Sequence, residues 1–210
     1  MGKILAFTNQ KGGTGKTTLS ANLAVLWSNS QYKVAVIDGD YQKSLTYWIE
    51  ARKKYYGEGD IGIDVISYNS HSLGEDIKNI KRKYNFIIID SPPSITYDTI
   101  QIVKNADKVF VPMQPSPLDL MATIPFLNLV KQQRKKAMII LNRVMPRAKL
   151  TDAMILRLRY AGAKIARSRI SSKVIFAETY SIGRGVIDIN VTSDASREII
   201  NLGNEIIRNF

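Results

Sequence analysis

The sequence of 210 residues contains no cysteine and a single histidine, His71. Without cysteine there are no disulfides, thiolate metal sites or iron–sulfur clusters, which excludes an electron carrier built on such a cluster. One histidine alone does not build a metal site, and we expect His71 in a loop or at the start of a helix. The sequence also lacks a run of about 18 apolar residues and the layout of a signal peptide, so we predict a cytoplasmic protein without a membrane span.

Acidic residues are scarce in one part of the chain. The formal net charge is +12, from 30 Lys and Arg against 18 Asp and Glu. Between Lys131 and Lys173, thirteen Lys and Arg stand against one acid, Asp152, whereas the rest of the chain holds 17 of each sign. The whole excess of positive charge therefore lies in 43 consecutive residues. Such segregation indicates a polyanionic partner.

Apolar runs alternate with helical patterns along the chain. The runs predict strands near residues 3–8, 33–37, 61–67, 86–90, 108–112, 137–142 and 163–169. Helical patterns lie between them and at 193–208, after a mixed stretch that ends at Ile189. This alternation predicts an α/β fold, a doubly wound and mostly parallel sheet with helices on both faces. No repeat, linker or change of composition divides the chain, so we expect a single domain over residues 1–210.

The stretch after the first apolar run has the pattern of a phosphate-binding loop. A glycine-rich turn, residues 9–15, leads directly into Lys16-Thr17-Thr18 and a helical pattern. Glycines let the backbone curl around a phosphate, and the helix that follows presents its N–H groups to the anion. We expect Lys16 to reach the β- and γ-phosphates and the Thr17 hydroxyl to hold Mg²⁺. The standard pattern G-x-x-x-x-G-K-[ST] is broken at Gln10, and an additional cation, Lys11, precedes the glycines.

Acidic residues stand at the ends of two other predicted strands. Asp38 and Asp40 follow one apolar run, and Asp90 closes another, Phe86–Ile89. Ligands in doubly wound sheets bind beyond the carboxyl ends of the strands, where these acids and the glycine-rich loop converge. Asp90 is therefore predicted to hold Mg²⁺ through a water molecule, and one acid of the Asp38–Asp40 pair to orient a water that attacks the γ-phosphate.

These motifs resemble those of the ParA/MinD ATPases. Lys11-Gly12-Gly13-Thr14-Gly15-Lys16-Thr17-Thr18 resembles their deviant Walker A motif. Asp38-Gly39-Asp40-Tyr41-Gln42-Lys43-Ser44 is similar to their Asp-x-Asp-Pro-Gln-x-Ser motif, with Tyr41 in place of proline. Asp90 falls at the end of their Walker B strand. The run Pro115-Ser116-Pro117-Leu118-Asp119 and the chain length look most like the small plasmid-partition ATPases typified by ParF.

The resemblance implies a slow Mg²⁺-dependent ATPase with the P-loop fold that closes as a homodimer around ATP. It implies catalytic roles for Lys11, which crosses to the partner's ATP, for Lys16, and for Asp40, which positions water. Thr17, Asp38 and Asp90 are implied to support the metal. The implied nucleotide-binding residues are Gly12, Gly13, Thr14, Gly15, Lys16, Thr17, Thr18, the base-contacting Asn142, and Pro115 and Pro117, which border the nucleotide and the dimer interface.

Partition members of this family bind DNA through basic residues in their C-terminal part. The basic segment is accordingly interpreted as a surface for non-specific duplex DNA, made by Arg157, Arg159, Lys164, Arg167, Arg169 and Lys173. The resemblance implies a nucleoid-associated protein that segregates plasmid or chromosomal DNA, with hydrolysis stimulated by a centromere-binding adaptor protein. Assembly of dimers into filaments is compatible with this interpretation.

Three alternatives stay open on the sequence. A MinD-like ATPase that positions division proteins on a membrane needs an amphipathic basic tail, and residues 198–210 carry only one cation, Arg208. An amide-forming ligase of the same broad class lacks the Lys-Gly-Gly loop and has no reason to concentrate charge in one segment. The basic segment itself is also compatible with a solvated helix face that only confers solubility.

Overall fold

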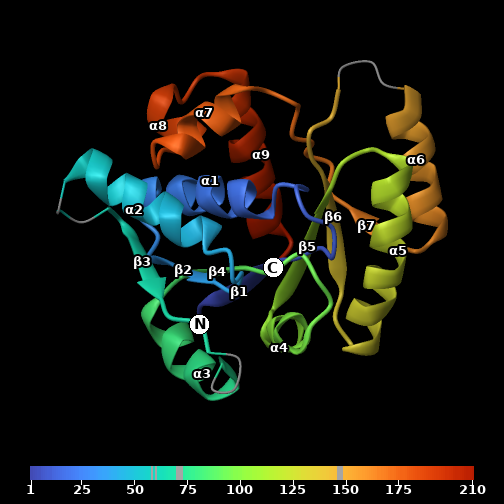
Figure 1. Ribbon diagram of the computed structural model, residues 1–210, viewed down its shortest axis with the longest axis horizontal. Coiled ribbons are helices and arrows are strands. Elements are labelled where there is room, and N and C mark those ends of the chain that lie inside the picture. Colours follow the sequence, from blue (N-terminus) through green and yellow to red (C-terminus); the bar gives the residue numbers. More distant parts are fainter. Residues whose placement is uncertain (58, 60, 70–72, 146–148) are drawn as a thin grey trace.

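The computed structural model describes residues 1–57, 59, 61–69, 73–145 and 149–210. His71 lies outside the described residues, so its predicted position stays a prediction. Seven strands form one sheet in the order β3-β2-β4-β1-β5-β6-β7 (Figure 1), and every pairing between them is parallel. The strands are β1 Lys3–Phe7, β2 Val34–Asp38, β3 Ile63–Ile66, β4 Phe86–Asp90, β5 Lys108–Met113, β6 Ala137–Leu141 and β7 Lys164–Ile165.

Helices cover both faces of this sheet (Figure 1). One face carries α1 Lys16–Asn29, α2 Ser44–Tyr56, α7 Ile175–Ser181, α8 Val186–Ile189 and α9 Asp194–Arg208. The other carries α3 Leu73–Lys83, α4 Tyr97–Asn105, α5 Pro117–Gln132 and α6 Lys149–Tyr160. The predicted doubly wound α/β fold is therefore confirmed, with an all-parallel sheet.

The central strands are apolar throughout because both of their faces are buried. In β4, Phe86 and Ile88 face the core beneath α1, whereas Ile87 and Ile89 face the core on the opposite side. Successive side chains of a strand point to opposite faces, so a strand between two helical layers needs apolar residues at every position. Each fully buried side chain of this size contributes about 1.5–3 kcal/mol.

Two segments differ from the sequence-based expectation. The strand expected over 163–169 is reduced to two paired residues, because Arg167 and Ser168 donate their backbone N–H groups to the Glu205 carboxylate on α9. The mixed stretch before Ile189 forms the short helices α7 and α8. Within the described part of the chain, none of the helices is long and apolar enough to cross a membrane.

Candidate nucleotide-binding site

The carboxyl ends of β1, β2 and β4 meet at one edge of the sheet. Asp90 pairs in register with Phe7 on one side and with Asp38 on the other. The glycine-rich loop begins directly after β1, so the parallel arrangement alone brings the loop and the two acids together. The three strand ends predicted to converge on a ligand therefore lie side by side.

The loop between β1 and α1 has the backbone shape that its glycines permit. Gly13 and Gly15 have φ angles of 73° and 94°, a region that favours glycine. Gly15 is the residue immediately before α1, and a Cβ atom on it would lie 2.0 Å from the Asn142 amide nitrogen. That amide donates to the Thr14 carbonyl over 2.7 Å. Asn142, predicted to contact a base, thus also holds the loop itself.

Lys16 and Asp90 form the charged centre of the site. Lys16 is 6% exposed and Asp90 is fully buried. Burial lowers the pKa of the Lys16 ammonium, and the charges of Asp90 and Asp40 oppose that effect. Burial also raises the pKa of Asp90 to about 7, with Lys16 and the Thr17 hydroxyl acting in the opposite direction. Lys16 therefore interacts electrostatically with both acids.

The surroundings of Asp90 fit a metal-bound water. Neither carboxylate oxygen has a hydrogen-bond partner of normal geometry among the described residues, although the Thr17 hydroxyl is near enough to lower the pKa. A buried carboxylate without partners is costly unless a cation or an ordered water completes it. The described residues contain no group of three or more His, Cys, Asp or Glu that could hold a metal ion.

Asp38 and Asp40 have different surroundings. Both oxygens of Asp38 are engaged, Oδ1 by the Asp40 backbone N–H and Oδ2 by the backbone N–H and hydroxyl of Thr46 at 2.8 Å each. Asp38 thereby fastens the first turn of α2 to the end of β2. Asp40 Oδ1 accepts from the Gln42 N–H, and the Lys43 N–H donates to the Asp40 carbonyl. These two bonds close the turn, although Tyr41 stands where the resembling motif has proline.

Lys11 is held by a residue of its own chain. Its ammonium forms an ion pair with Asp119, which is 1% exposed. Asp119 also accepts from the Ser116 hydroxyl and from the Gln114 backbone N–H. The segment between β5 and α5 therefore forms a second wall beside the loop, and the Gln114 side chain donates to the Gly13 carbonyl.

A pocket of about 390 Å³ opens beside Gly15 and Thr18. Its other walls are Leu19, Asn142, Arg143 and residues of the segment from 170 to 180, including Ser171, Ser172, Lys173, Val174, Phe176, Ala177 and Tyr180. It combines apolar side chains with a few polar groups, as small-molecule sites do. A nucleotide whose phosphates lie in the loop would extend its sugar and base into this pocket.

The predicted site residues thus fall into three groups. The loop residues Gly12 to Thr18, with Asp38, Asp40 and Asp90, lie together at the strand ends, and Asn142 joins them. Pro115 and Pro117 lie on the wall beside Lys11 and do not line the 390 Å³ pocket. Lys173 lines that pocket and pairs at 2.5 Å with Glu198, a residue that also lines a groove together with Arg167 and Arg169.

The other predicted DNA-binding residues lie at the β7 end of the sheet. Arg157 and Arg159 are in the last turn of α6, whereas Lys164, Arg167 and Arg169 lie on β7 or just after it. We call this set the basic edge; its members are Arg157, Arg159, Lys164, Arg167 and Arg169, all exposed. A groove of about 860 Å³ between the segment 164–169 and α9 collects three of these bases together with Arg208. The acids in that groove, Glu198 and Glu205, are already bonded to backbone and side-chain donors.

Sequence reasoning missed two residues of the site. Asp119 had a signal, because Ser-x-x-Asp before an apolar run is typical of a helix start, but nothing linked it to Lys11. Tyr180 had none, since it lies in a helix of seven residues that no periodicity reveals. Its hydroxyl donates to the Ser44 carbonyl at 2.7 Å while its ring lines the pocket.

The fold and this loop define a P-loop nucleotide-binding protein. A profile of the CobQ/CobB/MinD/ParA nucleotide-binding domain matches residues 5–186. The chain belongs to this family, whose ParA and MinD members are P-loop ATPases.

Individual relatives extend over nearly the whole chain. The maintenance of carboxysome distribution protein A of Halothiobacillus neapolitanus is 29% identical over 97% of this chain and 95% of its own. The chromosome partitioning protein ParA of Caulobacter vibrioides is 24% identical over 98% of this chain and 94% of its own. A putative plasmid partition protein of Borrelia burgdorferi, solved with AMPPNP, shares the fold over the full length of both chains, with a TM-score of 0.79 at 20% identity. The chain is thus a relative of ATPases that position different cargoes.

Proposed function

We propose that this protein is a partition ATPase that binds Mg²⁺–ATP, dimerises, binds duplex DNA without sequence preference, and is reset by hydrolysis. The observation that carries the proposal is the convergence of Lys16, Asp40 and Asp90 on the loop at the carboxyl edge of the sheet. The names of the relatives support a role in distributing a cargo.

Each residue at this edge has a proposed task. Lys16 and the backbone N–H groups of residues 12–18 bind the β- and γ-phosphates. Thr17 and, through water, Asp90 hold Mg²⁺, which neutralises charge on those phosphates. Asp38 supports this arrangement by fixing the turn, and Asp40 orients the attacking water. Lys11 leaves Asp119 to reach the γ-phosphate in the facing subunit.

Dimerisation follows from the distribution of charge. In a dimer, each triphosphate meets Lys16 of its own subunit and Lys11 of the facing subunit. Two positive charges stabilise bound ATP more than one, so ATP favours the dimer. Hydrolysis removes the γ-phosphate that these charges hold, and the dimer is then less stable and dissociates. The nucleotide thereby sets the association state.

The basic edge is the proposed DNA surface. Glu205 fixes the backbone at Arg167 and Ser168, and so presents the Arg167 and Arg169 side chains outward. Lys173 lines the nucleotide pocket, and its charge is paired with Glu198, so we assign it a smaller share of the DNA surface than Arg167 and Arg169. The apolar face of α9 is buried in the core through Ile199, Leu202 and Ile206, so these side chains are not available to a membrane surface.

The test is retention on non-specific duplex DNA with ATP, ADP or no nucleotide over a salt series. We expect tight binding with ATP only, with a log–log slope against salt of roughly −0.9 per neutralised phosphate. Arg167→Glu/Arg169→Glu should abolish retention, whereas the matched reversal Lys53→Glu/Lys54→Glu, at two exposed positions of α2, should preserve it. Equal loss in both variants, or binding indifferent to nucleotide, would contradict the proposed surface or its coupling. Binding to anionic vesicles and not to DNA would favour the membrane alternative.

A further inference from the structure

The far wall of the nucleotide pocket belongs to the segment of residues 174–189, which contains α7 and α8 and which we call the α7–α8 segment. Val174, Phe176, Ala177 and Tyr180 of this segment line the pocket. The loop and α1 form the near wall, through Gly15, Thr18 and Leu19. How tightly a nucleotide is enclosed therefore depends on where the α7–α8 segment lies.

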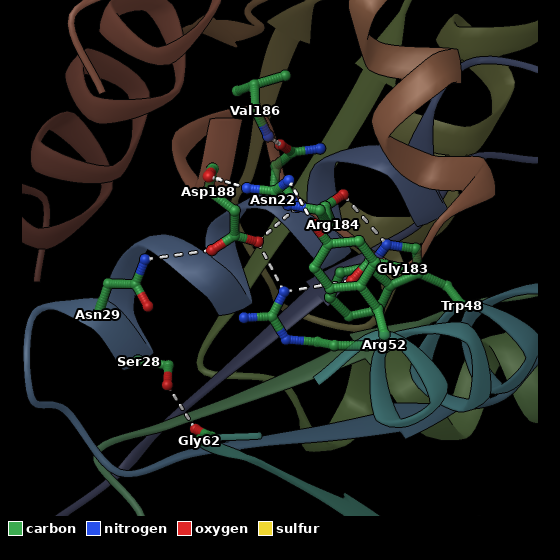
Figure 2. Close-up of polar contacts among 12 residues, drawn as sticks. Asn22, Ser28, Asn29, Trp48, Arg52, Gly62, Gly183, Arg184, Val186 and Asp188 are labelled. Atoms are coloured by element: carbon green, nitrogen blue, oxygen red, sulfur yellow. Dashed lines mark hydrogen bonds and ion pairs between the residues drawn. The ribbon is translucent and has the colours of Figure 1, made fainter. Parts of the chain in front are cut away.

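One buried ion pair ties this segment to α2. Arg52 Nη1 of α2 donates to Asp188 Oδ2 at 2.7 Å and to the Gly183 carbonyl at 3.2 Å (Figure 2). The two side chains are only 5% and 6% exposed. The guanidinium also lies over the rings of Tyr56 and Trp48. Each of these buried charges needs the other, because a buried charge that loses its partner is costly.

Other contacts on the same segment reinforce the attachment. Arg184 bonds to the Asp188 carbonyl (Figure 2). Asp188 Oδ2 also accepts from the Gly185 N–H, and Arg184 bonds to the Tyr55 hydroxyl. At Gly183, with φ 69°, a Cβ atom would lie 2.0 Å from the Arg52 backbone nitrogen. The turn between α7 and α8 thus packs directly on the backbone of α2.

The same segment contacts the two helices that follow the glycine-rich loop and Asp40, α1 and α2. The Val186 N–H donates to Asn22 of α1, whose amide in turn donates to the Thr18 carbonyl. Tyr180 donates to the Ser44 carbonyl, at the first residue of α2 and a few residues after Asp40. The α7–α8 segment therefore joins the pocket to the start of α1 and to the start of α2.

We infer that Arg52 and Asp188 are a positioning pair that fixes the α7–α8 segment against α2 and so sets the lifetime of the bound nucleotide. Neither residue lines the 390 Å³ pocket, so the pair acts through the segment and not by contact. The inference rests on the proposed nucleotide binding. A buried pair of this kind contributes little net stability relative to apolar side chains, but its loss removes a directional constraint.

The experiment uses the variant Arg52→Met/Asp188→Asn. Methionine keeps the length of the side chain but donates no hydrogen bonds, and asparagine removes the unpaired charge while its oxygen still accepts from Gly185. Dissociation of a fluorescent ATP analogue is followed by stopped-flow chase, and KM and kcat for ATP are measured. We expect dissociation about tenfold faster and KM raised by a similar factor, with kcat changed much less.

The matched control is Lys81→Met/Asp107→Asn, which removes an ion pair of 2.8 Å on the other side of the sheet. It should leave the dissociation rate within about twofold of the parent. A folded Arg52→Met/Asp188→Asn protein that releases the analogue at the parental rate overturns the inference. If the parent itself retains no analogue, the proposed function fails, and with it the inference.

A second variant decides the matter if the double variant does not fold. Arg184→Met removes the contacts to the Asp188 carbonyl and to Tyr55, and Arg184 is only partly buried and does not line the pocket. We expect a smaller acceleration of dissociation, about threefold. An unchanged rate in this variant equally overturns the inference.

Discussion

Replacing Asp90 by asparagine removes a negative charge from the interior and keeps the shape of the side chain. Asp90 is fully buried, and its oxygens have no hydrogen-bond partner of normal geometry among the described residues. Burial raises the pKa of Asp90 to about 7, and the charges of Asp38 and Asp40 add to the rise against Lys16 and Thr17. We therefore expect Asp90→Asn to stabilise the protein in the absence of metal and nucleotide.

The magnitude follows from the pKa. A rise from 3.8 to about 7 destabilises the folded protein with ionised Asp90 by about 4 kcal/mol, at roughly 1.4 kcal/mol per pKa unit. Because this pKa is raised, Asp90 does not destabilise the fold below about pH 4. The destabilisation grows between about pH 4 and 7 and reaches its full value above about pH 7. Asparagine does not titrate. The free energy of unfolding of the variant should exceed that of the parent by about 4 kcal/mol at pH 8 and by about 2 kcal/mol at pH 5.

The assay is urea unfolding at both pH values in EDTA without nucleotide. Asp152→Asn, at an exposed carboxylate on α6, is the control and should change the free energy of unfolding by less than about 0.5 kcal/mol. With Mg²⁺–ATP added, the parent should gain stability and the variant much less, since only the parent completes the metal site. A variant that is no more stable than the parent at pH 8, or equally favoured at both pH values, would refute the reasoning.

Three further changes test the loop, the segment after β7 and the core. Gly15→Ala should lower nucleotide affinity at least about tenfold in a fluorescence titration, because the new Cβ atom would lie 2.0 Å from the Asn142 amide. Gly13→Ala, whose Cβ atom would meet no atom within 4 Å, should lower the affinity less. Equal losses of affinity in the two variants would contradict the steric argument. Burial alone would raise the pKa of Glu205. Hydrogen bonds from two backbone N–H groups outweigh that effect and leave the pKa below its usual value. Its contribution to stability is therefore present above about pH 4.5 and lost on acidification, so Glu205→Gln should destabilise by about 1 kcal/mol at pH 7 in urea unfolding and by less at pH 3. Ile199→Ala in the fully buried face of α9 should cost about 2–5 kcal/mol in the same assay, and a loss below 1 kcal/mol would mean that α9 does not belong to the core.

Much of the fold and of the phosphate site could be predicted because the signals are local. The β4 run Phe86–Ile89 reads as a strand buried on both faces, and parallel pairing then requires Asp38 and Asp90 to meet. The loop from Lys11 to Thr18 is recognisable because glycine spacing and the lysine–threonine pair dictate one backbone shape. Both inferences need only neighbouring residues and the rule that parallel strands share an edge.

The parts that could not be predicted depend on contacts between distant segments. Nothing near Lys11 in the sequence indicates that Asp119 holds it. The expected strand at 163–169 is cut short by Glu205, nearly forty positions later, which offers its backbone a different acceptor. Tyr180 escapes notice because α7 is too short to show a helical period.

The segment from Arg167 to Lys173 connects the basic edge to the wall of the pocket. Arg167 and Arg169 of the basic edge stand at its beginning, and Ser171, Ser172 and Lys173 of the pocket wall stand at its end. Glu205 clamps the first part of this segment and Glu198 the last, both from one rigid helix. The wall of the pocket and part of the basic edge therefore belong to one short stretch of backbone that is held on the same helix.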